Sequence, residues 1–170
     1  MATATKTVTS GKHEGIPPRE RILATAVELF YRHGIRAVGV DSIAEAAGTN
    51  KMTLYRHFTS KDELVAEYLR RLADKATLVW GRLASQYPGD ARAQLRGWLQ
   101  EMAAHVESGK ERGCALANAA VELPEKDHPA RRVIEAFKTA QRRRIIELCR
   151  EGLGDRLVRM GEAMIAAHDK

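Results

Sequence analysis

The sequence has few of the features that build sheets, membrane spans or disulfide frameworks. Aromatic residues make up 5% of its 170 residues, and it holds two cysteines and five prolines. No alternating run of Val, Ile and Thr is long enough to predict a sheet. No apolar run approaches the roughly 20 residues needed to cross a bilayer, and the N-terminus lacks the apolar core of a signal peptide. These absences favour a helical, cytoplasmic protein that has no membrane partner.

Metal and catalytic patterns are also missing. Cys114 and Cys149 lack the close spacing of a metal site or a disulfide framework. They are interpreted as small buried hydrophobes in a reducing cytoplasm, with a redox-sensing thiol as the alternative. Glu101 and His105 share a helix face at i, i+4, but metal or acid–base chemistry needs a further partner in register. The sequence therefore predicts no metal, no cofactor and no enzymatic activity.

Helix-forming residues and positive charge are plentiful. The hydrophobic fraction of 44% and the charged fraction of 29% are those of a globular protein, and abundant Ala, Leu, Arg and Glu favour helix. Residues 1–61 hold nine Lys and Arg against five Asp and Glu, so about a third of the chain carries +4 of the net charge of +6. A basic end attracts phosphate and speeds the encounter with DNA. The alternative is a generally basic, solvated surface.

The most informative stretch is residues 42–58, which predicts two short helices joined by a glycine turn. In the first helix, Ile43, Ala46 and Ala47 recur at the spacing of one buried stripe. Gly48 then supplies the permissive backbone that a helix-ending turn needs.

The second of these helices combines an apolar anchor with a polar face. Leu54 and Phe58, four residues apart, are expected to hold it against the same core. Its other residues are mostly polar and have no evident use inside a core. This arrangement predicts a helix-turn-helix, whose second helix enters the DNA major groove.

The same residues carry a family resemblance. The motif Leu-Tyr-Arg-His-Phe at 54–58, followed by Lys-Asp-Glu-Leu at 61–64, resembles the N-terminal domain of the tetracycline-repressor (TetR) family, and the similarity covers about 19–66. Residues 113–120 and the His-Pro pair at 128–129 are similar to a later segment of many such regulators. The resemblance implies a homodimeric, all-helical transcriptional regulator with a variable ligand-binding domain.

DNA contacts are expected from the helix-turn-helix in two groups. Side chains whose donors, acceptors or methyl groups match base edges read the sequence: Asn50, Lys51, Met52, Thr53 and Arg56. The resemblance assigns Tyr55, His57 and Lys61 to phosphate contacts, which position a protein without reading sequence, and hydroxyl contacts are expected from Ser42 and Thr49. The alternative is that these are ordinary surface polar residues.

The expected fold is all-α and has three parts. Residues 1–18, rich in Thr, Ser, Gly and Lys, are predicted to be a disordered arm. Residues 19–66 form the three-helix DNA-binding domain, and 67–170 form a helical ligand-binding and dimerisation domain. Asp41 or Ser42 is expected to cap the second helix, and a capping box at Ser60 and Glu63 opens the fourth. Later helices are predicted over about 60–85, 90–108, 114–123, 129–152 and 155–167.

A ligand site is expected in the second domain, between helices. Such pockets are typically apolar with a few polar groups, so the effector is predicted to be a small, mostly apolar molecule. The alternative for each residue is plain core packing. The candidate lining residues are Trp80, Trp98, Met102, His105, Cys114, Asn118 and Phe137.

Dimerisation is expected through the helix over 129–152 and the segment after it. An apolar stripe on that helix is predicted to meet its symmetry mate in a two-fold dimer. The family's members usually continue into a full-length final helix, whereas here glycines interrupt the ending, so a weaker dimer is expected. The predicted interface residues are Val133, Phe137, Ile145, Leu148, Leu157 and Met164.

Together these patterns predict a ligand-responsive repressor that binds a palindromic operator as a homodimer. One alternative is a DNA-binding protein with a degenerate regulatory domain. A more distant alternative is a small helical enzyme or an interaction protein whose basic end is incidental. Steeply salt-dependent DNA binding separates the first two from the third.

Overall fold

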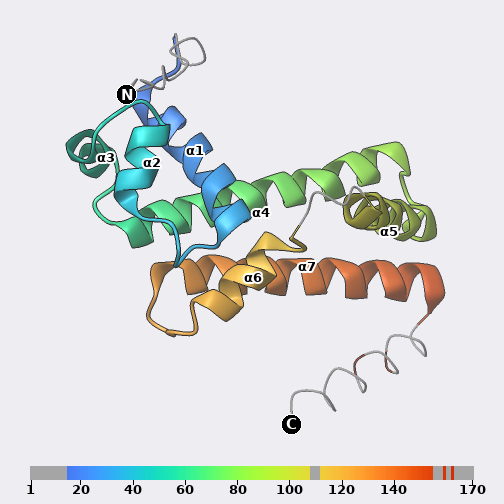
Figure 1. Ribbon diagram of the computed structural model, residues 1–170. Coiled ribbons are helices and arrows are strands. Elements are labelled where there is room, and N and C mark those ends of the chain that lie inside the picture. Colours follow the sequence, from blue (N-terminus) through green and yellow to red (C-terminus); the bar gives the residue numbers. More distant parts are fainter. Residues whose placement is uncertain (1–14, 108–111, 155–158, 160–161, 163–170) are drawn as a thin grey trace. The chain divides into compact units, whose positions relative to one another are not determined.

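The computed structural model describes residues 15–107, 112–154, 159 and 162, and the chain divides into two compact units, Met1–Tyr68 and Leu69–Lys170. In this described part the regular structure is entirely helical, as predicted (Figure 1). The helices are α1 (Pro18–His33), α2 (Val40–Ala46), α3 (Lys51–His57), α4 (Lys61–Gln86), α5 (Ala91–Glu107), α6 (Ala115–Glu122) and α7 (Pro129–Leu153).

The first unit contains α1, α2, α3 and the first two turns of α4. Helix α1 buries Ile22, Ala26 and Phe30 along one face, which is the stripe that its helical spacing predicts. The ring of Phe30 lies 5.5 Å from that of Tyr68, at a tilted angle of 53°. Aromatic pairs favour tilted or offset geometry, and this pair joins α1 to α4 in the core of the unit.

Helix α2 differs in detail from the prediction. Ile43 and Ala47 are buried as expected, but the third buried residue is Ala44, while Ala46 is exposed. The helix also begins earlier, because the extended Gly39 is its N-cap and accepts the N–H of Ile43 through its carbonyl. No side chain caps α2, so the predicted cap at Asp41 or Ser42 is wrong.

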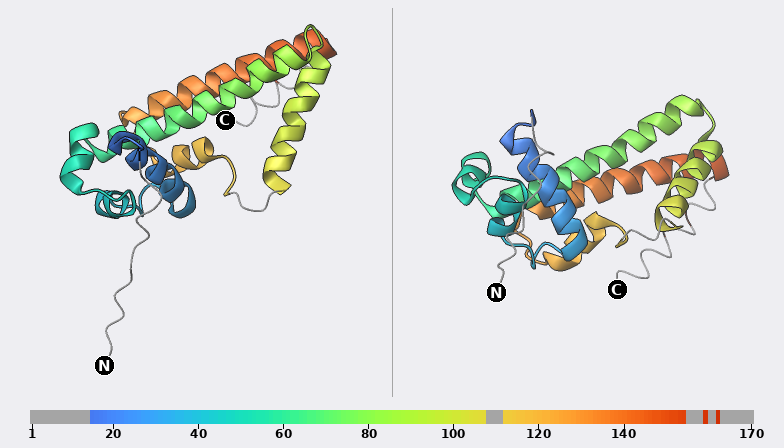
Figure 2. Two further views of the ribbon diagram at one scale, coloured as in Figure 1. Left: turned by 90° about the horizontal axis from the view of Figure 1, so that it is seen from above. Right: turned by 45° about the horizontal axis from the view of Figure 1, so that its top comes forward.

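The second unit is built around the packing of α5 and α6 against α7. Figure 2 shows α5 turning back steeply from the end of α4. The turn includes Gly89 with φ +73°, and the Asp90 carboxylate caps α5 by accepting the N–H of Ala93 at 2.9 Å. At the start of α7, Pro129 occupies the first turn, where its missing N–H costs nothing.

A buried glutamine holds two helices and a turn together in this unit. Gln94 on α5 is 6% exposed. Its amide N–H donates to the Tyr87 carbonyl at 2.8 Å, and its amide oxygen accepts from Arg144 of α7, also at 2.8 Å. Because a buried amide without partners is costly, these bonds fix how α5 meets α7.

Most expected helix limits agree with the structure to within one or two residues. The predicted arm over 1–18 lies largely outside the described residues, and α1 already begins at Pro18. The predicted final helix over 155–167 lies outside them apart from residues 159 and 162. Within the residues that the structure describes, no helix is both long enough and apolar enough to cross a membrane.

Two helical glycines give a test of the packing. Gly81 on α4 has open space where a Cβ would stand, whereas a Cβ on Gly97 of α5 would lie 2.7 Å from Cδ2 of the buried Leu83. We expect Gly81→Ala to raise the free energy of unfolding by about 0.5–1 kcal/mol through helix propensity. Gly97→Ala should lower the free energy of unfolding by about 1 kcal/mol. Overpacking costs about 1–3 kcal/mol, which exceeds the gain of about 0.5–1 kcal/mol from helix propensity. Urea unfolding of both variants measures the contrast, and equal stabilisation by the two would contradict this packing.

Candidate nucleic-acid interface

The turn between α2 and α3 sets the direction of α3. Gly48 adopts a left-handed backbone with φ +63°. Its N–H donates to the Glu45 carbonyl at 3.0 Å, and the N–H of Thr49 donates to the Ala44 carbonyl at 2.9 Å. These two bonds are those of a Schellman motif, which ends a helix and favours glycine at the left-handed position. Figure 1 shows α3 seen end-on beside α2, so the two axes cross steeply.

Helix α3 is anchored by two apolar residues and presents the rest to solvent. Leu54 is 0% exposed, and Phe58, the residue after the helix, is 1% exposed. By contrast, Met52 is 75% exposed and Tyr55 is 42% exposed. A large apolar side chain so far out of the core on a short helix has no structural use here, so it points to an interaction surface.

Asn50 has a structural role that competes with its predicted contact with DNA bases. It is the N-cap of α3, and its side-chain oxygen accepts the N–H of Thr53 at 2.8 Å. Bidentate reading of adenine needs both the amide oxygen and the amide N–H of asparagine. Because the oxygen is already engaged in the cap, the main role of Asn50 in this structure is to cap the start of α3.

Lys51, the first residue of α3, is bonded to a carboxylate on α2. Its ammonium lies 3.1 Å from the carboxylate of Asp41, and both side chains are exposed. The hydrogen bond and the charge of Asp41 raise the pKa of Lys51 above its usual value. Asp41 on α2 thus holds the Lys51 ammonium at the start of α3.

The structure brings all ten predicted DNA-binding residues onto α2, the turn, α3 and the start of α4. Their exposure differs, because α3 has one face in the core. Exposed side chains are Ser42, Asn50, Lys51, Met52, Tyr55 and Arg56, and half-buried ones are Thr49, Thr53, His57 and Lys61.

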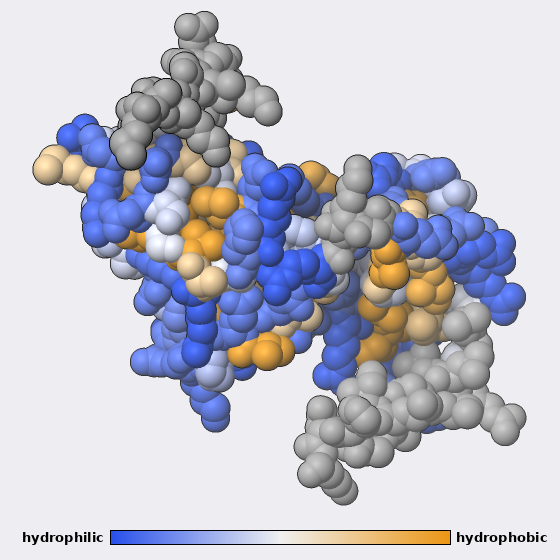
Figure 3. Space-filling model, in the orientation of Figure 1, coloured by the Kyte–Doolittle hydropathy of each residue, from blue (hydrophilic) through white to orange (hydrophobic). Residues whose placement is uncertain are grey.

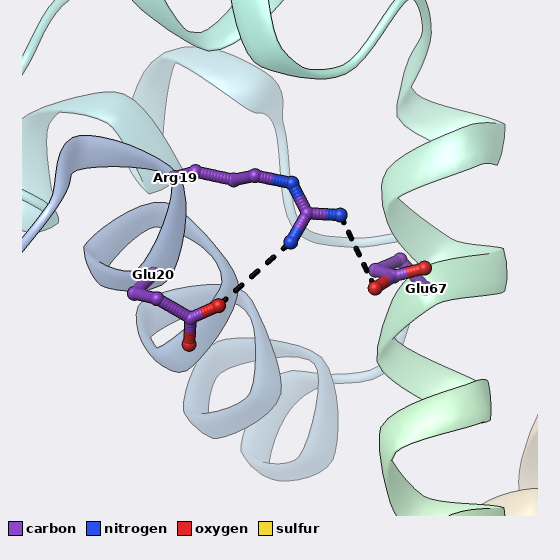
Figure 4. A network of polar contacts seen from close by, with 3 residues as sticks. All are labelled: Arg19, Glu20 and Glu67. Carbon is purple, nitrogen blue, oxygen red and sulfur yellow. Dashed lines mark hydrogen bonds and ion pairs between the residues drawn. The ribbon is translucent and has the colours of Figure 1, made fainter.

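Arg19 ties the end of α3 to α1 and α4, as Figure 4 shows for its ion pairs. Its guanidinium lies 3.2 Å from the carboxylate of Glu67 on α4 and 3.7 Å from that of Glu20. The same group stands over the ring of Phe58, 5.1 Å from its centroid. Arginine combines ion pairing with stacking on an aromatic face, so this one side chain contacts three parts of the unit.

The start of α4 is capped by the side chains of Ser60 and Glu63. The Ser60 hydroxyl accepts the N–H of Glu63 at 3.0 Å, as in the predicted capping box. The Glu63 carboxylate reaches one residue further back and accepts both the N–H and the hydroxyl of Thr59 at 2.6 Å. The cap fixes the chain directly after α3.

The predicted ligand-lining residues are only partly brought together. Trp80 of α4 and Trp98 of α5 stack with ring centroids 5.2 Å apart and planes 17° apart. Cys114 and Asn118 lie one turn apart at the start of α6, where the Asn118 amide donates to the Arg112 carbonyl at 2.7 Å. Of the rest, Met102 and His105 are exposed on α5, and Phe137 is half-buried on α7.

Helix α5 carries an apolar stripe that faces solvent. Leu99, Met102 and Val106 are 53%, 47% and 72% exposed, and they recur at the spacing of one helix face. Figure 3 shows apolar surface beside α5. An exposed apolar stripe of this kind is a candidate interaction surface.

The apolar stripe of α7 faces its own unit. Leu148 is 1% exposed and Ile134 is 2% exposed, and Val133, Phe137 and Ile145, which lie on the same side, are half-buried. Since this side packs against α5 and α6, we withdraw the prediction that Leu148 meets a second copy. The predicted contacts of Leu157 and Met164 lie outside the described residues.

Two residues of this interface have no signal in the sequence. Asp41 was expected to cap α2, and nothing in the spacing of residues 41 and 51 indicates an ion pair across the turn. Arg19 lies 48 residues from Glu67, and only the folded unit brings them together.

A steeply crossed helix pair, joined by a glycine turn and presenting an exposed second helix, defines the helix-turn-helix class. Residues 22–68 match the family described as "Bacterial regulatory proteins, tetR family". The chain is 32% identical over 140 residues to the HTH-type transcriptional repressor SCO4008 of Streptomyces coelicolor, covering 75% of this chain and 67% of that protein. The solved structure of SCO4454, a TetR-family transcriptional regulator from the same species, matches with a TM-score of 0.72 and 32% identity over 79% of this chain and 70% of that one. The chain belongs to the TetR family.

Another relative matches about half of the chain. The HTH-type transcriptional activator FasR of Mycolicibacterium smegmatis is 39% identical over 90 residues, which are 52% of this chain and 40% of FasR. The chain therefore matches less than half the length of this relative.

Proposed function

We propose that this protein is a transcriptional repressor that binds a palindromic DNA operator as a homodimer in the cytoplasm and releases it when a small apolar molecule binds. The observation that carries the proposal is α3, which is anchored by Leu54 and Phe58 while Met52 and Tyr55 project from it. An exposed second helix of this kind fits the major groove. The relatives are regulators of transcription and include both a repressor and an activator, and the longer match to the repressor favours repression.

Within the interface, position along the fold separates the roles of two lysines. Lys51 opens α3, where side chains reach base edges. Lys61 opens α4, after the cap at the end of α3, and is suited to the phosphate backbone.

We expect Lys51→Ala to lower affinity for the operator by roughly tenfold or more while leaving affinity for unrelated DNA nearly unchanged. Lys61→Ala should lower both affinities alike and flatten the dependence on salt by about one counter-ion. The operator is first selected from a randomised duplex library with the wild-type protein, and it is then titrated at several salt concentrations. If both variants bind both duplexes with wild-type affinity, neither lysine contacts DNA.

The proposed effector site lies in the second unit, beside the stacked Trp80 and Trp98. Helix α5, which carries Trp98, also offers exposed apolar surface at Leu99, Met102 and Val106. Burial of such surface is favourable, which supports an apolar effector. Helix α4 begins in the first unit and ends in the second, so it offers a continuous element through which binding can bias the DNA-binding state.

We expect an apolar compound that binds this site to change the tryptophan fluorescence, and the Trp98→Phe variant to lose most of that signal. The same compound should lower operator affinity, and by thermodynamic reciprocity saturating operator should lower affinity for the compound by an equal factor. A screen of small apolar compounds, with titration of each binder in the presence and absence of operator, measures both. A compound that binds, changes the fluorescence and leaves operator affinity unaltered would contradict induction by that compound.

The proposed dimer uses the side of α7 opposite to its apolar stripe. This exposed side has small residues at its centre and charged residues toward both ends. A shallow recess there is lined by Arg132, Glu135, Ala136, Thr139, Ala140 and Arg143. Small residues at a crossing point let two helices approach closely.

The order of charges along this side suits a two-fold partner. If two copies of α7 lie antiparallel and cross between Thr139 and Ala140, Arg132 of each copy stands opposite Glu147 of the other. Arg143 then stands opposite Ala136, one position from Glu135. An isologous interface needs such self-complementarity, and it requires no residue of the inward stripe.

We expect Arg132→Glu to weaken dimerisation by at least about tenfold, because it places like charges together at both ends of the interface. Glu147→Arg should do the same, and an equal mixture of the two variants should form heterodimers in which both pairs are restored. Sedimentation at tens of micromolar measures assembly, and Arg96→Glu, an exposed reversal on α5, serves as the matched control. Wild-type dimerisation in Arg132→Glu, or failure of the mixture to recover, would refute this register.

A further inference from the structure

Three consecutive residues at the start of α3 differ in what their side chains already contact. Asn50 caps the helix by accepting the N–H of Thr53. The ammonium of Lys51 is bonded to Asp41 on α2. Met52 follows them and is 75% exposed. An apolar side chain that lies so far out of the core contributes little to folding, so its place at the start of α3 favours a role in binding.

The chemistry of the methionine side chain limits what it can recognise. A thioether donates no hydrogen bond and is a weak acceptor, so it gains little from polar groups. The base edges in the major groove are mostly polar: they present N7 and O6 of guanine, N7 and N6 of adenine, and N4 of cytosine. A methionine pressed against such an edge removes water from donors and acceptors and does not replace the lost hydrogen bonds, which is costly.

Thymine adds an apolar group to this edge, its C5-methyl. Contact between that methyl group and a thioether removes apolar surface from water on both partners, which is favourable. The N-terminal residues of a recognition helix are those that reach base edges, and Met52 is the second residue of α3. Its unbranched side chain can also adjust to the exact place of the methyl group.

We propose that Met52 is a specificity-determining residue that reads the C5-methyl group of a pyrimidine in each half of the operator. The inference rests on the proposed function, because it takes α3 to be the DNA-reading helix. In unmodified DNA this methyl group belongs to thymine. 5-Methylcytosine carries the same group on the same ring atom, so methylation of a cytosine at this position raises affinity through the same contact.

The test removes single methyl groups from the DNA. The operator is selected from a randomised duplex library with the wild-type protein. Each of its thymines is then replaced in turn by uracil, which differs from thymine only in lacking the methyl group. We expect one thymine in each half-site to be sensitive, with a loss of affinity of about three- to fivefold for one substitution and roughly tenfold when both half-sites are substituted.

Three variants assign the contact to Met52. Met52→Ala should bind the operator more weakly than the wild type does, and uracil at the sensitive position should then have no further effect. Met52→Leu stays apolar and should keep most of the sensitivity to the methyl group. Met102→Ala is the matched control, because it removes a methionine that is 47% exposed on α5, and it should keep both the wild-type affinity and the sensitivity. Thermal unfolding of each variant confirms that the fold is retained.

A second measurement places cytosine at the sensitive position. Replacing the T·A pair by C·G should lower the affinity of the wild-type protein, and methylation of that cytosine at C5 should restore about three- to fivefold. Met52→Ala should show no such recovery. Its absence separates contact with Met52 from an effect of the methyl group on the shape of the duplex.

Each outcome decides the matter. A scan in which no uracil substitution weakens binding by the wild-type protein overturns the role of Met52. A methyl effect of the same size in Met52→Ala assigns the contact to another group, such as the Thr53 methyl, and also overturns it. Unaltered operator affinity in Met52→Ala, or an equal loss in Met102→Ala, overturns it as well. If the wild-type protein selects no duplex at all, the proposed function itself fails, which is a separate result.

Discussion

The geometry of the interface depends on the left-handed backbone of Gly48. With φ at +63° and two hydrogen bonds back into α2, the chain reverses within four residues and sends α3 off at a steep angle. A side chain at this position is strained in that conformation. The direction of α3 lets Leu54 and Phe58 reach the core, while Met52 and Tyr55 project outward. The Asn50 cap starts the helix. Arg19 then secures the far end of α3 through Phe58, so the helix is held at both ends.

Much of this architecture could be predicted because it depends on local patterns. The glycine turn, the Ser60 cap, the proline at the start of α7 and the helical spacing of Ile22, Ala26 and Phe30 each leave a signature within a few residues. The predictions that were wrong concern which side of a helix faces what. In α2, Ala44 and not Ala46 joins Ile43 and Ala47 in the core. The α7 stripe was correctly identified as apolar, but periodicity cannot distinguish burial against the same chain from burial against a second copy.

The site shows the same contrast between local and long-range signals. The ten residues expected to meet DNA lie close together in sequence, so the motif alone was enough to predict them as a group. The ion pairs around them join residues that no local pattern connects, ten positions apart for Asp41 and Lys51 and 48 for Arg19 and Glu67. Lys51 and Asp41 meet only because the turn folds back, and Arg19 meets Glu67 only through the packing of α1 on α4. Long-range pairs between exposed charges carry no periodic signal, and a residue such as Asn50 can serve a cap where its chemistry alone suggests a base contact.

The division of the chain inside α4 also matters for protein engineering. The boundary between the two units falls between Tyr68 and Leu69, about two turns into the continuous helix from Lys61 to Gln86. A chimera that joins this DNA-binding unit to the sensor of a relative must therefore be spliced in helical register. Each residue added or removed at the junction rotates the downstream part of the helix by about 100° and moves it by about 1.5 Å along the axis. An insertion of about seven residues is close to two full turns, so the downstream side chains keep nearly their original orientation about the helix axis.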